Sequence, residues 1–214
     1  MAAQRAEGNH RISGTLPGNG NQRVDVVVSG GQTMNPSTAD ILAAIEQANA
    51  ENVIVMPNNG NIRMASEAAA TACESARVAV VPTKTVLQSF SAMFAVDAEA
   101  MTEAIADVRG GEVTRAVRDS SASDGTPIHD GDVMGIQDGS IDVVGSDVAD
   151  VTIELINKMQ EDEEGDSLTI LAGSDMDDES FEALIARIEE AQPDLEIDSH
   201  RGEQPLYPVI FSIE

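Results

Sequence analysis

Aromatic and basic residues are both scarce in this sequence, and each shortage restricts what the protein can be. Aromatic residues make up 2% of the 214 residues and tryptophan is absent, so the core has to be built from aliphatic side chains and methionine. Only 12 lysines and arginines stand against 38 acidic residues, which gives a formal net charge of −26. Proteins bind nucleic acids and anionic membranes through lysine and arginine, so this charge argues against both as partners. The negative charge favours a basic protein partner or a cell interior with a high salt concentration.

Cysteine and long apolar runs are scarce as well. Cys73 is the only cysteine, which excludes an internal disulfide framework. Its Ala-rich, helix-patterned surroundings predict an inert thiol. No apolar run approaches the length of a membrane span, and no signal-peptide pattern is present. We therefore expect a cytoplasmic protein without a membrane span.

The order strand, polar turn, helix occurs three times in the first half of the chain. Apolar runs at residues 24–28, 53–56 and 78–81 predict buried strands, and a helix-patterned segment follows each of them. This order predicts a parallel sheet with right-handed crossovers. The expected fold class is α/β, a mostly parallel sheet flanked by helices with a small antiparallel β insertion lobe.

The domain organisation follows from changes in this pattern. Residues 1–23 lack apolar periodicity and predict a flexible arm, while residues 24–214 predict a single α/β domain. Asp138-Gly139 between two apolar runs indicates a hairpin. The expected parts are a first α/β lobe, a helix plus β-hairpin lobe and a returning α/β part, at residues 24–95, 96–146 and 147–214.

Polar turns at the strand ends form the candidate site, because ligands of open α/β sheets bind at the carboxyl ends of the strands. In the stretch Gly30 to Thr38, glycines permit close approach of a ligand and the helix start offers unpaired N–H groups. Ser37 or Thr38 is expected to cap this helix, with Asp40 as the candidate capping-box partner of Ser37. Ordinary βα turns and a solvated lysine remain the alternative interpretation. The candidate ligand-binding or docking residues are Thr33, Asn35, Ser37, Thr38, Asn58, Asn59, Thr83, Lys84, His200 and Arg201.

Complete catalytic motifs are missing. The sequence has no P-loop, no GxGxxG fingerprint, no Gly-x-Ser-x-Gly elbow and no His or Cys pair at metal-ligand spacing. We therefore predict no catalytic residue and no metal ligand, and expect a binding or docking module that is not catalytic alone. His129 is interpreted as a surface-loop residue rather than a base or ligand.

Five segments resemble motifs of a known family in the right order. The segments are Ser29 to Thr38, Val55 to Asn59, Pro82 to Thr85, Gly131 to Gly139 and His200 to Pro208. Together they cover roughly residues 24–214, and they resemble the C-terminal domain of the bacterial fatty acid kinase A subunit, a dihydroxyacetone-kinase-like (DAK phosphatase domain) protein.

This resemblance implies a fold similar to the DegV-type fatty-acid-binding B subunits and to the substrate domain of dihydroxyacetone kinases. It implies a module that docks the acyl-binding B subunit, so that a separate ATP-binding domain phosphorylates the fatty acid carboxylate. ATP and Mg²⁺ would bind only in that kinase domain, which belongs to the same polypeptide or operon, and no cofactor is expected in this chain. A homodimer is kept as an option. In B subunits, polar residues and a histidine hold the lipid carboxylate, and the similar positions here are Thr33, Asn35, Ser37, Asn59 and His200.

The resemblance also leaves alternatives. The chain could be a substrate-binding domain that holds a dihydroxyacetone-like ketone or a fatty acid in the strand-end crevice, with His200 at the site. A hydrolase acting through His129 or His200 is a third hypothesis, without a nucleophile to support it. The family usually has a further strand before Val24, which residues 1–23 do not predict, and Gly-Gly where this chain has Gly202-Glu203.

Overall fold

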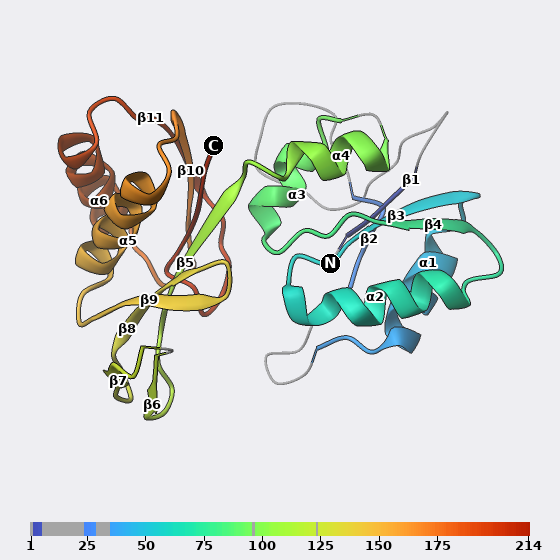
Figure 1. The fold of residues 1–214 in the computed structure, drawn as a ribbon, viewed down its shortest axis with the longest axis horizontal. Coiled ribbons are helices and arrows are strands. Elements are labelled where there is room, and N and C mark those ends of the chain that lie inside the picture. Colours follow the sequence, from blue (N-terminus) through green and yellow to red (C-terminus); the bar gives the residue numbers. More distant parts are fainter. Residues whose placement is uncertain (1, 6–23, 29–34, 96, 123) are drawn as a thin grey trace. The chain divides into compact units, whose positions relative to one another are not determined.

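A computed structural model describes residues 2–5, 24–28, 35–95, 97–122 and 124–214. The chain forms two compact units, Met1–Asp107 and Val108–Glu214, each with its own sheet and helices (Figure 1). The boundary between the units falls inside the middle part that the sequence predicted, residues 96–146. The three predicted parts are therefore not the compact units of the structure.

The first unit contains a four-stranded sheet in the order β2-β1-β3-β4. β3 and β4 are parallel, whereas β1 is antiparallel to both of its neighbours, β2 and β3. The three predicted strands therefore run in one direction, but β1 separates the first from the second. The bounds are β1 Ala2–Arg5, β2 Val26–Val27, β3 Asn52–Met56 and β4 Arg77–Val80.

Strand β1 corrects the prediction of a flexible arm for the part of the arm that the structure describes. Its residues Ala2 to Arg5 pair with Met56 to Val53 of β3. Strand β1 is held by backbone hydrogen bonds, which do not depend on an apolar pattern. Because its sequence lacks such a pattern, the strand could not be predicted.

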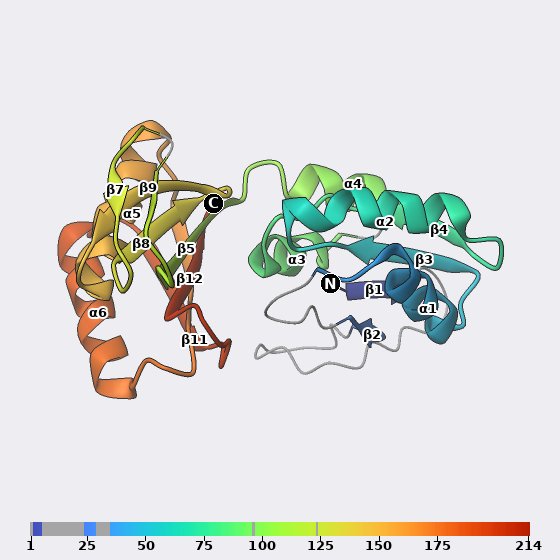
Figure 2. The same cartoon turned by 90° about the horizontal axis from the view of Figure 1, so that it is seen from below.

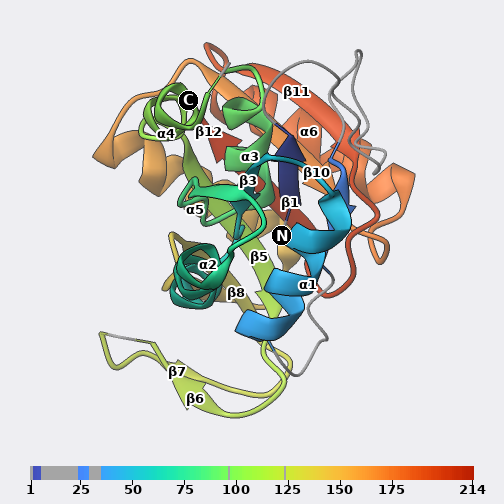
Figure 3. The same cartoon turned by 90° about the vertical axis from the view of Figure 1, so that its right-hand side faces the viewer.

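Helices cover both faces of the first sheet (Figure 3). Val53 and Val55 of β3 pack with α1 and α2, while Ile54 and Met56 pack on the opposite side with residues of α3 and α4. This division follows from the alternation of side chains along a strand. The helices are α1 Thr38–Ala48, α2 Gly60–Ala72, α3 Val86–Ala92 and α4 Ala98–Ala104.

The predicted capping box at the start of α1 is confirmed. The backbone N–H of Asp40 donates to Ser37 Oγ at 3.2 Å, and the backbone N–H of Ser37 donates to Asp40 Oδ2 at 2.9 Å. The hydrogen bonds from the Ser37 side chain and then its backbone lower the pKa of Asp40. The sequence therefore specified this helix start correctly.

The second unit contains a six-stranded sheet in the order β11-β10-β12-β5-β8-β9. β10 and β11 are parallel, and every other neighbouring pair is antiparallel. The bounds are β5 Arg109–Arg115, β8 Val133–Gln137, β9 Ser140–Gly145, β10 Ser167–Ala172, β11 Glu196–Arg201 and β12 Val209–Ile213, with a separate short pair β6 Ser120–Ser121 and β7 Pro127–Ile128.

This sheet confirms the predicted hairpin but contradicts the prediction of a separate antiparallel lobe. β8 and β9 pair around Asp138 and Gly139, which have positive φ angles of 50° and 90°, as a tight hairpin turn requires. The predicted antiparallel lobe is not separate, because β12 lies between β10 and β5 and so joins the hairpin strands to the last α/β part. The parallel character of the fold is consequently only partial.

Helices α5 (Val148–Asp162) and α6 (Asp178–Ala191) pack on one face of this sheet (Figure 2). The core between them is aliphatic, as the scarcity of aromatic residues predicted, and Phe211 is its central aromatic ring. Gly111 lies opposite Phe211 in the sheet, and a Cβ atom there would overlap the ring. In the described residues no helix is both long and apolar enough to cross a membrane.

Candidate functional site

Asn58 and Thr83, two of the predicted site residues, meet at the ends of β3 and β4. Asn58 has a left-handed backbone with φ of 56°, and its N–H donates to Thr83 Oγ1 at 3.0 Å. The Thr83 hydroxyl donates in turn to Asn58 Oδ1 at 2.8 Å, and the hydroxyl of Ser89 donates to the same oxygen. Thr83 and Ser89 are buried, so this is a closed network rather than a set of exposed binding groups.

The turn after β4 extends this network. The backbone N–H of Lys84 donates to Oε1 of the buried Gln88 at 2.6 Å, and Thr85 caps α3 by accepting from the N–H of Gln88 at 3.2 Å. Sequence reasoning missed Ser89 and Gln88. Both lie in the first turn of α3 and are buried there together with Leu87. Polar residues among the apolar residues of this helix pattern were the available signal.

Three further predicted residues of the first unit, Ser37, Thr38 and Asn59, lie at helix starts. Ser37 caps α1, where Thr38 begins the helix, and Asn59 caps α2 by accepting from the N–H of Asn61 at 2.9 Å. Asn35 is exposed, while Thr33 lies outside the described residues. Ser37 and Asn59 therefore have an evident structural role.

His200 and Arg201 lie in the second unit, on β11. His200 Nε2 is 2.9 Å from Asp198 Oδ2, an interaction that orients the imidazole ring. Arg201 Nη1 donates to the carbonyl of Met176 at 2.6 Å and Nη2 donates to that of Gly173 at 3.4 Å. Arg201 thus fixes the loop between β10 and α6.

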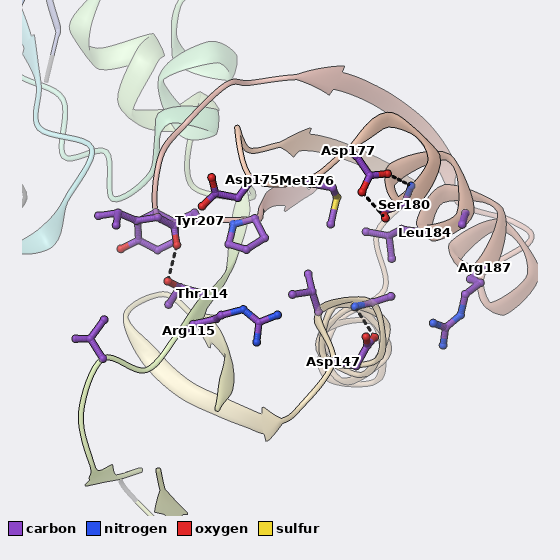
Figure 4. Close-up of a pocket in the computed structure, with 16 residues that line it drawn as sticks. Thr114, Arg115, Asp147, Asp175, Met176, Asp177, Ser180, Leu184, Arg187 and Tyr207 are labelled. Carbon is purple, nitrogen blue, oxygen red and sulfur yellow. Dashed lines mark hydrogen bonds between the residues drawn. The ribbon is translucent and has the colours of Figure 1, made fainter. Parts of the chain in front are cut away.

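The second unit has a groove that the sequence did not predict (Figure 4). Its volume is about 740 Å³, and it lies between the starts of α5 and α6, the end of β5 and the segment 206–208. Its lining includes Val148, Met176, Leu184 and Pro208, which are apolar. No local sequence pattern predicts this groove, because its walls come from segments far apart in the chain.

Carboxylates at the two helix starts shape one side of this groove. Asp147 accepts from the N–H groups of Ala149 and Asp150 at 2.9 and 3.0 Å, and so caps α5. Asp177 caps α6 by accepting from the N–H of Ser180 at 2.8 Å, and the hydrogen bonds from Ser180 hold the pKa of Asp177 below its usual value. Both caps therefore occupy N–H groups that an anionic ligand would otherwise bind.

The segment 206–208 forms another wall of the groove and is held by side-chain hydrogen bonds. Gln204 Nε2 donates to the carbonyls of Leu171 and Tyr207 at 3.1 and 3.2 Å, and Thr114 Oγ1 donates to that of Leu206 at 2.7 Å. Leu206 has a φ of 71°, which is rare for a leucine, and its side chain is 49% exposed. A strained backbone persists only where its surroundings fix it, so Leu206 is held in place by this network.

Glu112 and Tyr207 have shifted pKa values near the same loop. Burial raises the pKa of Glu112. Burial also raises the pKa of Tyr207, and the negative charge of Glu112 adds to that effect. Among the described residues, no three His, Cys, Asp or Glu side chains are grouped so that they could hold a metal ion.

Comparison with solved structures places the fold in the DegV class. A DegV family protein from Corynebacterium glutamicum is similar with a TM-score of 0.55 and 12% identity, over 84% of this chain and 83% of that one. The Streptococcus pneumoniae fatty acid kinase (Fak) B3 protein, solved loaded with linoleic acid, is similar with a TM-score of 0.52 and 13% identity, over 84% of this chain and 76% of that one.

Sequence comparison then gives the family. The family model for the C-terminal part of A-like fatty acid kinase subunits (FakA-like) matches residues 20–214, and the chain belongs to this family. An uncharacterized protein of Staphylococcus haemolyticus is 40% identical over 196 residues, which are 88% of this chain and 35% of that protein. The chain thus spans about a third of the length of this curated relative, and the resemblance seen in the sequence motifs is confirmed.

Proposed function

We propose that this chain is the docking module of a fatty acid kinase A subunit. In this proposal it binds the acyl-loaded B subunit, while a separate ATP-binding domain phosphorylates the fatty acid carboxylate. ATP and Mg²⁺ are bound by that domain and not by this chain, and the reaction takes place in the cytoplasm, where ATP is available. The observation that carries the proposal is the family match over residues 20–214, which covers about a third of a longer relative.

Two structural features favour docking over holding a ligand. The first is the polar network at the ends of β3 and β4, where Asn58, Thr83 and Ser89 satisfy one another. A carboxylate or hydroxyl ligand would have to break these bonds, each of which costs free energy when a buried partner is left unsatisfied. The second is the charge of −26, which attracts a basic protein surface and repels a free anion.

Calorimetric titration with a purified B-type fatty-acid-binding protein, loaded with oleic acid, tests this proposal. We expect saturable binding that weakens as salt is raised, because opposite charges on the two proteins are screened. Absence of binding at the highest soluble concentrations would contradict the docking role.

A second function is favoured by the fold that this chain shares with a protein solved with linoleic acid bound. In this version the chain itself holds a fatty acid or a dihydroxyacetone-like ketone at the end of β11, where His200, oriented by Asp198, contacts it. Mass spectrometry of the purified protein would then detect a copurified fatty acid or a covalent adduct on His200. Detection of neither would remove this version and leave the docking role.

A further inference from the structure

We propose that the groove between α5, α6 and the segment 206–208 receives the B subunit. The occupant is a protruding segment of that protein which carries an apolar side chain next to lysine or arginine. This inference rests on the proposed function and assigns it to a particular surface of the second unit. The surface is defined by Val117, Leu206, the apolar lining and the carboxylates of Asp147, Asp175 and Asp177.

The apolar part of the groove is exposed where a partner could reach it. Val117 is 84% exposed and Leu206 is 49% exposed, and both line the same cavity. Single exposed apolar residues are common on protein surfaces, but two beside an apolar cavity are typical of a contact site. Met176 and Leu184 lie deeper and are buried, so an inserted side chain would meet apolar atoms on several sides.

Leu206 is also preorganised for such a contact. Thr114 donates to the carbonyl of Leu206 itself and Gln204 donates to that of Tyr207, so these bonds hold the backbone that has the positive φ. A contact residue that is already fixed loses little conformational entropy when a partner binds.

Charge selects a basic occupant rather than an anion. The second unit contains 27 acidic residues against 6 lysines and arginines, a formal charge of −21. Two arginines also line the groove: Arg187 lies 2.7 Å from Asp150, and Arg115 Nη1 donates to the carbonyl of Gly131 at 3.4 Å. Three carboxylates, those of Asp147, Asp175 and Asp177, lie beside them, and Asp147 and Asp177 already accept the helix N–H groups. A lysine or arginine beside an apolar side chain would therefore find carboxylates and an apolar pocket, in a unit whose net charge repels a free carboxylate or phosphate.

The test compares variants of two exposed groove residues with a matched variant elsewhere. Val117→Asn and Leu206→Asn remove the apolar side chains without adding charge, and asparagine tolerates the left-handed backbone at position 206. Met64→Asn is the control, because Met64 is 79% exposed and lies in the first unit. We expect each groove variant to weaken binding of the oleate-loaded B-type protein about tenfold and the double variant about a hundredfold. The control should keep its affinity.

A second pair of variants tests the charge. Asp175→Lys should slow association and reduce the dependence of the affinity on salt, whereas Glu189→Lys, on α6 outside the groove lining, should change both less. Circular dichroism and the unfolding midpoint of each variant establish that it is folded.

The outcomes separate the two proposals. No binding by the unmodified chain would overturn the docking role and this inference together. Binding by the unmodified chain with full affinity in the Val117→Asn, Leu206→Asn double variant would overturn the groove alone. If that double variant instead dissociates a dimer in sedimentation while its affinity for the B-type protein is unchanged, the groove joins two copies of this chain and the inference is wrong.

Discussion

Each unit is built from a sheet and helices, but the two use their polar residues differently. The first unit contains 11 acidic and 6 basic residues, a formal charge of −5, whereas the second has a formal charge of −21. In the first, hydroxyl and amide groups such as Thr83 and Asn58 bond to one another or cap helices. In the second, carboxylates and two exposed apolar side chains surround a groove. The polar groups at the strand ends of the first unit therefore satisfy one another, whereas those around the groove of the second unit lie beside exposed apolar side chains, and the docking proposal uses this difference.

The sheets differ in a way that matches their coverage by helices. The first has helices on both faces and three strands that run in one direction, whereas α5 and α6 pack on one face of the mainly antiparallel second sheet. Parallel strands occur where both faces are covered, while antiparallel sheets tolerate one uncovered face. The two units therefore call for separate tests of stability.

The largest effect is expected from Gly111→Ala, which should destabilise the second unit by about 3 kcal/mol, because the new methyl group overlaps the Phe211 ring. Fluorescence of Tyr207, the single tyrosine, follows unfolding of this unit, and the methyl NMR signal of Met101 follows the first. Gly60→Ala is the control, since a Cβ atom there meets nothing within 4 Å. An equal shift of both signals would show that the units unfold together.

A smaller effect is expected from Thr83→Val in the first unit. The substitution keeps the shape but leaves the Asn58 N–H without its acceptor, and it should cost about 2 kcal/mol in urea unfolding. Thr102→Val is the matched control, because Thr102 is exposed on α4. Affinity for the B-type protein should stay unchanged, and a loss of affinity in the folded variant would assign docking to the first unit instead.

The capping box of α1 should contribute still less to the free energy of unfolding. Ser37→Ala removes the acceptor of the Asp40 N–H and should lower the free energy of unfolding by about 1 kcal/mol. Ser37→Asn retains a capping oxygen and should lose little. If both variants lose the same amount, the cap does not stabilise α1.

The smallest effect concerns Glu112 and depends on pH. Burial raises the pKa of Glu112 above its ordinary value of 4.5, so the folded protein holds that proton more tightly than the unfolded chain does. The resulting stabilisation is present below pH 4.5 and is lost as pH rises through the raised pKa. Glu112→Gln should therefore raise the thermal midpoint at neutral pH and lose this advantage as the pH falls toward 4.5. A difference that is constant with pH would contradict a titrating Glu112.

Local features of this fold could be predicted from the sequence, and distant ones could not. The capping box of Ser37 and Asp40 and the hairpin at Asp138-Gly139 depend on neighbouring residues, and both were predicted correctly. The pairing of β1 and the insertion of β12 between β10 and β5 depend on backbone partners far along the chain, which no periodicity reveals. Asn58 and Thr83 were predicted as site residues because each follows a strand pattern in the sequence. The groove beside Leu206 was missed because its walls come from distant segments.

The position of β12 has a consequence for how the second unit folds. Its residues Val209 to Ile213 pair with β10 on one side and with β5, about a hundred positions earlier, on the other. During synthesis, β8, β9, α5 and α6 emerge before β12, which is the strand that joins the two halves of the sheet. Closing such a long loop is slow, so the half-formed sheet has an open edge that can pair with another chain until β12 arrives. Folding of this unit on the ribosome should therefore finish only after its last strand has emerged.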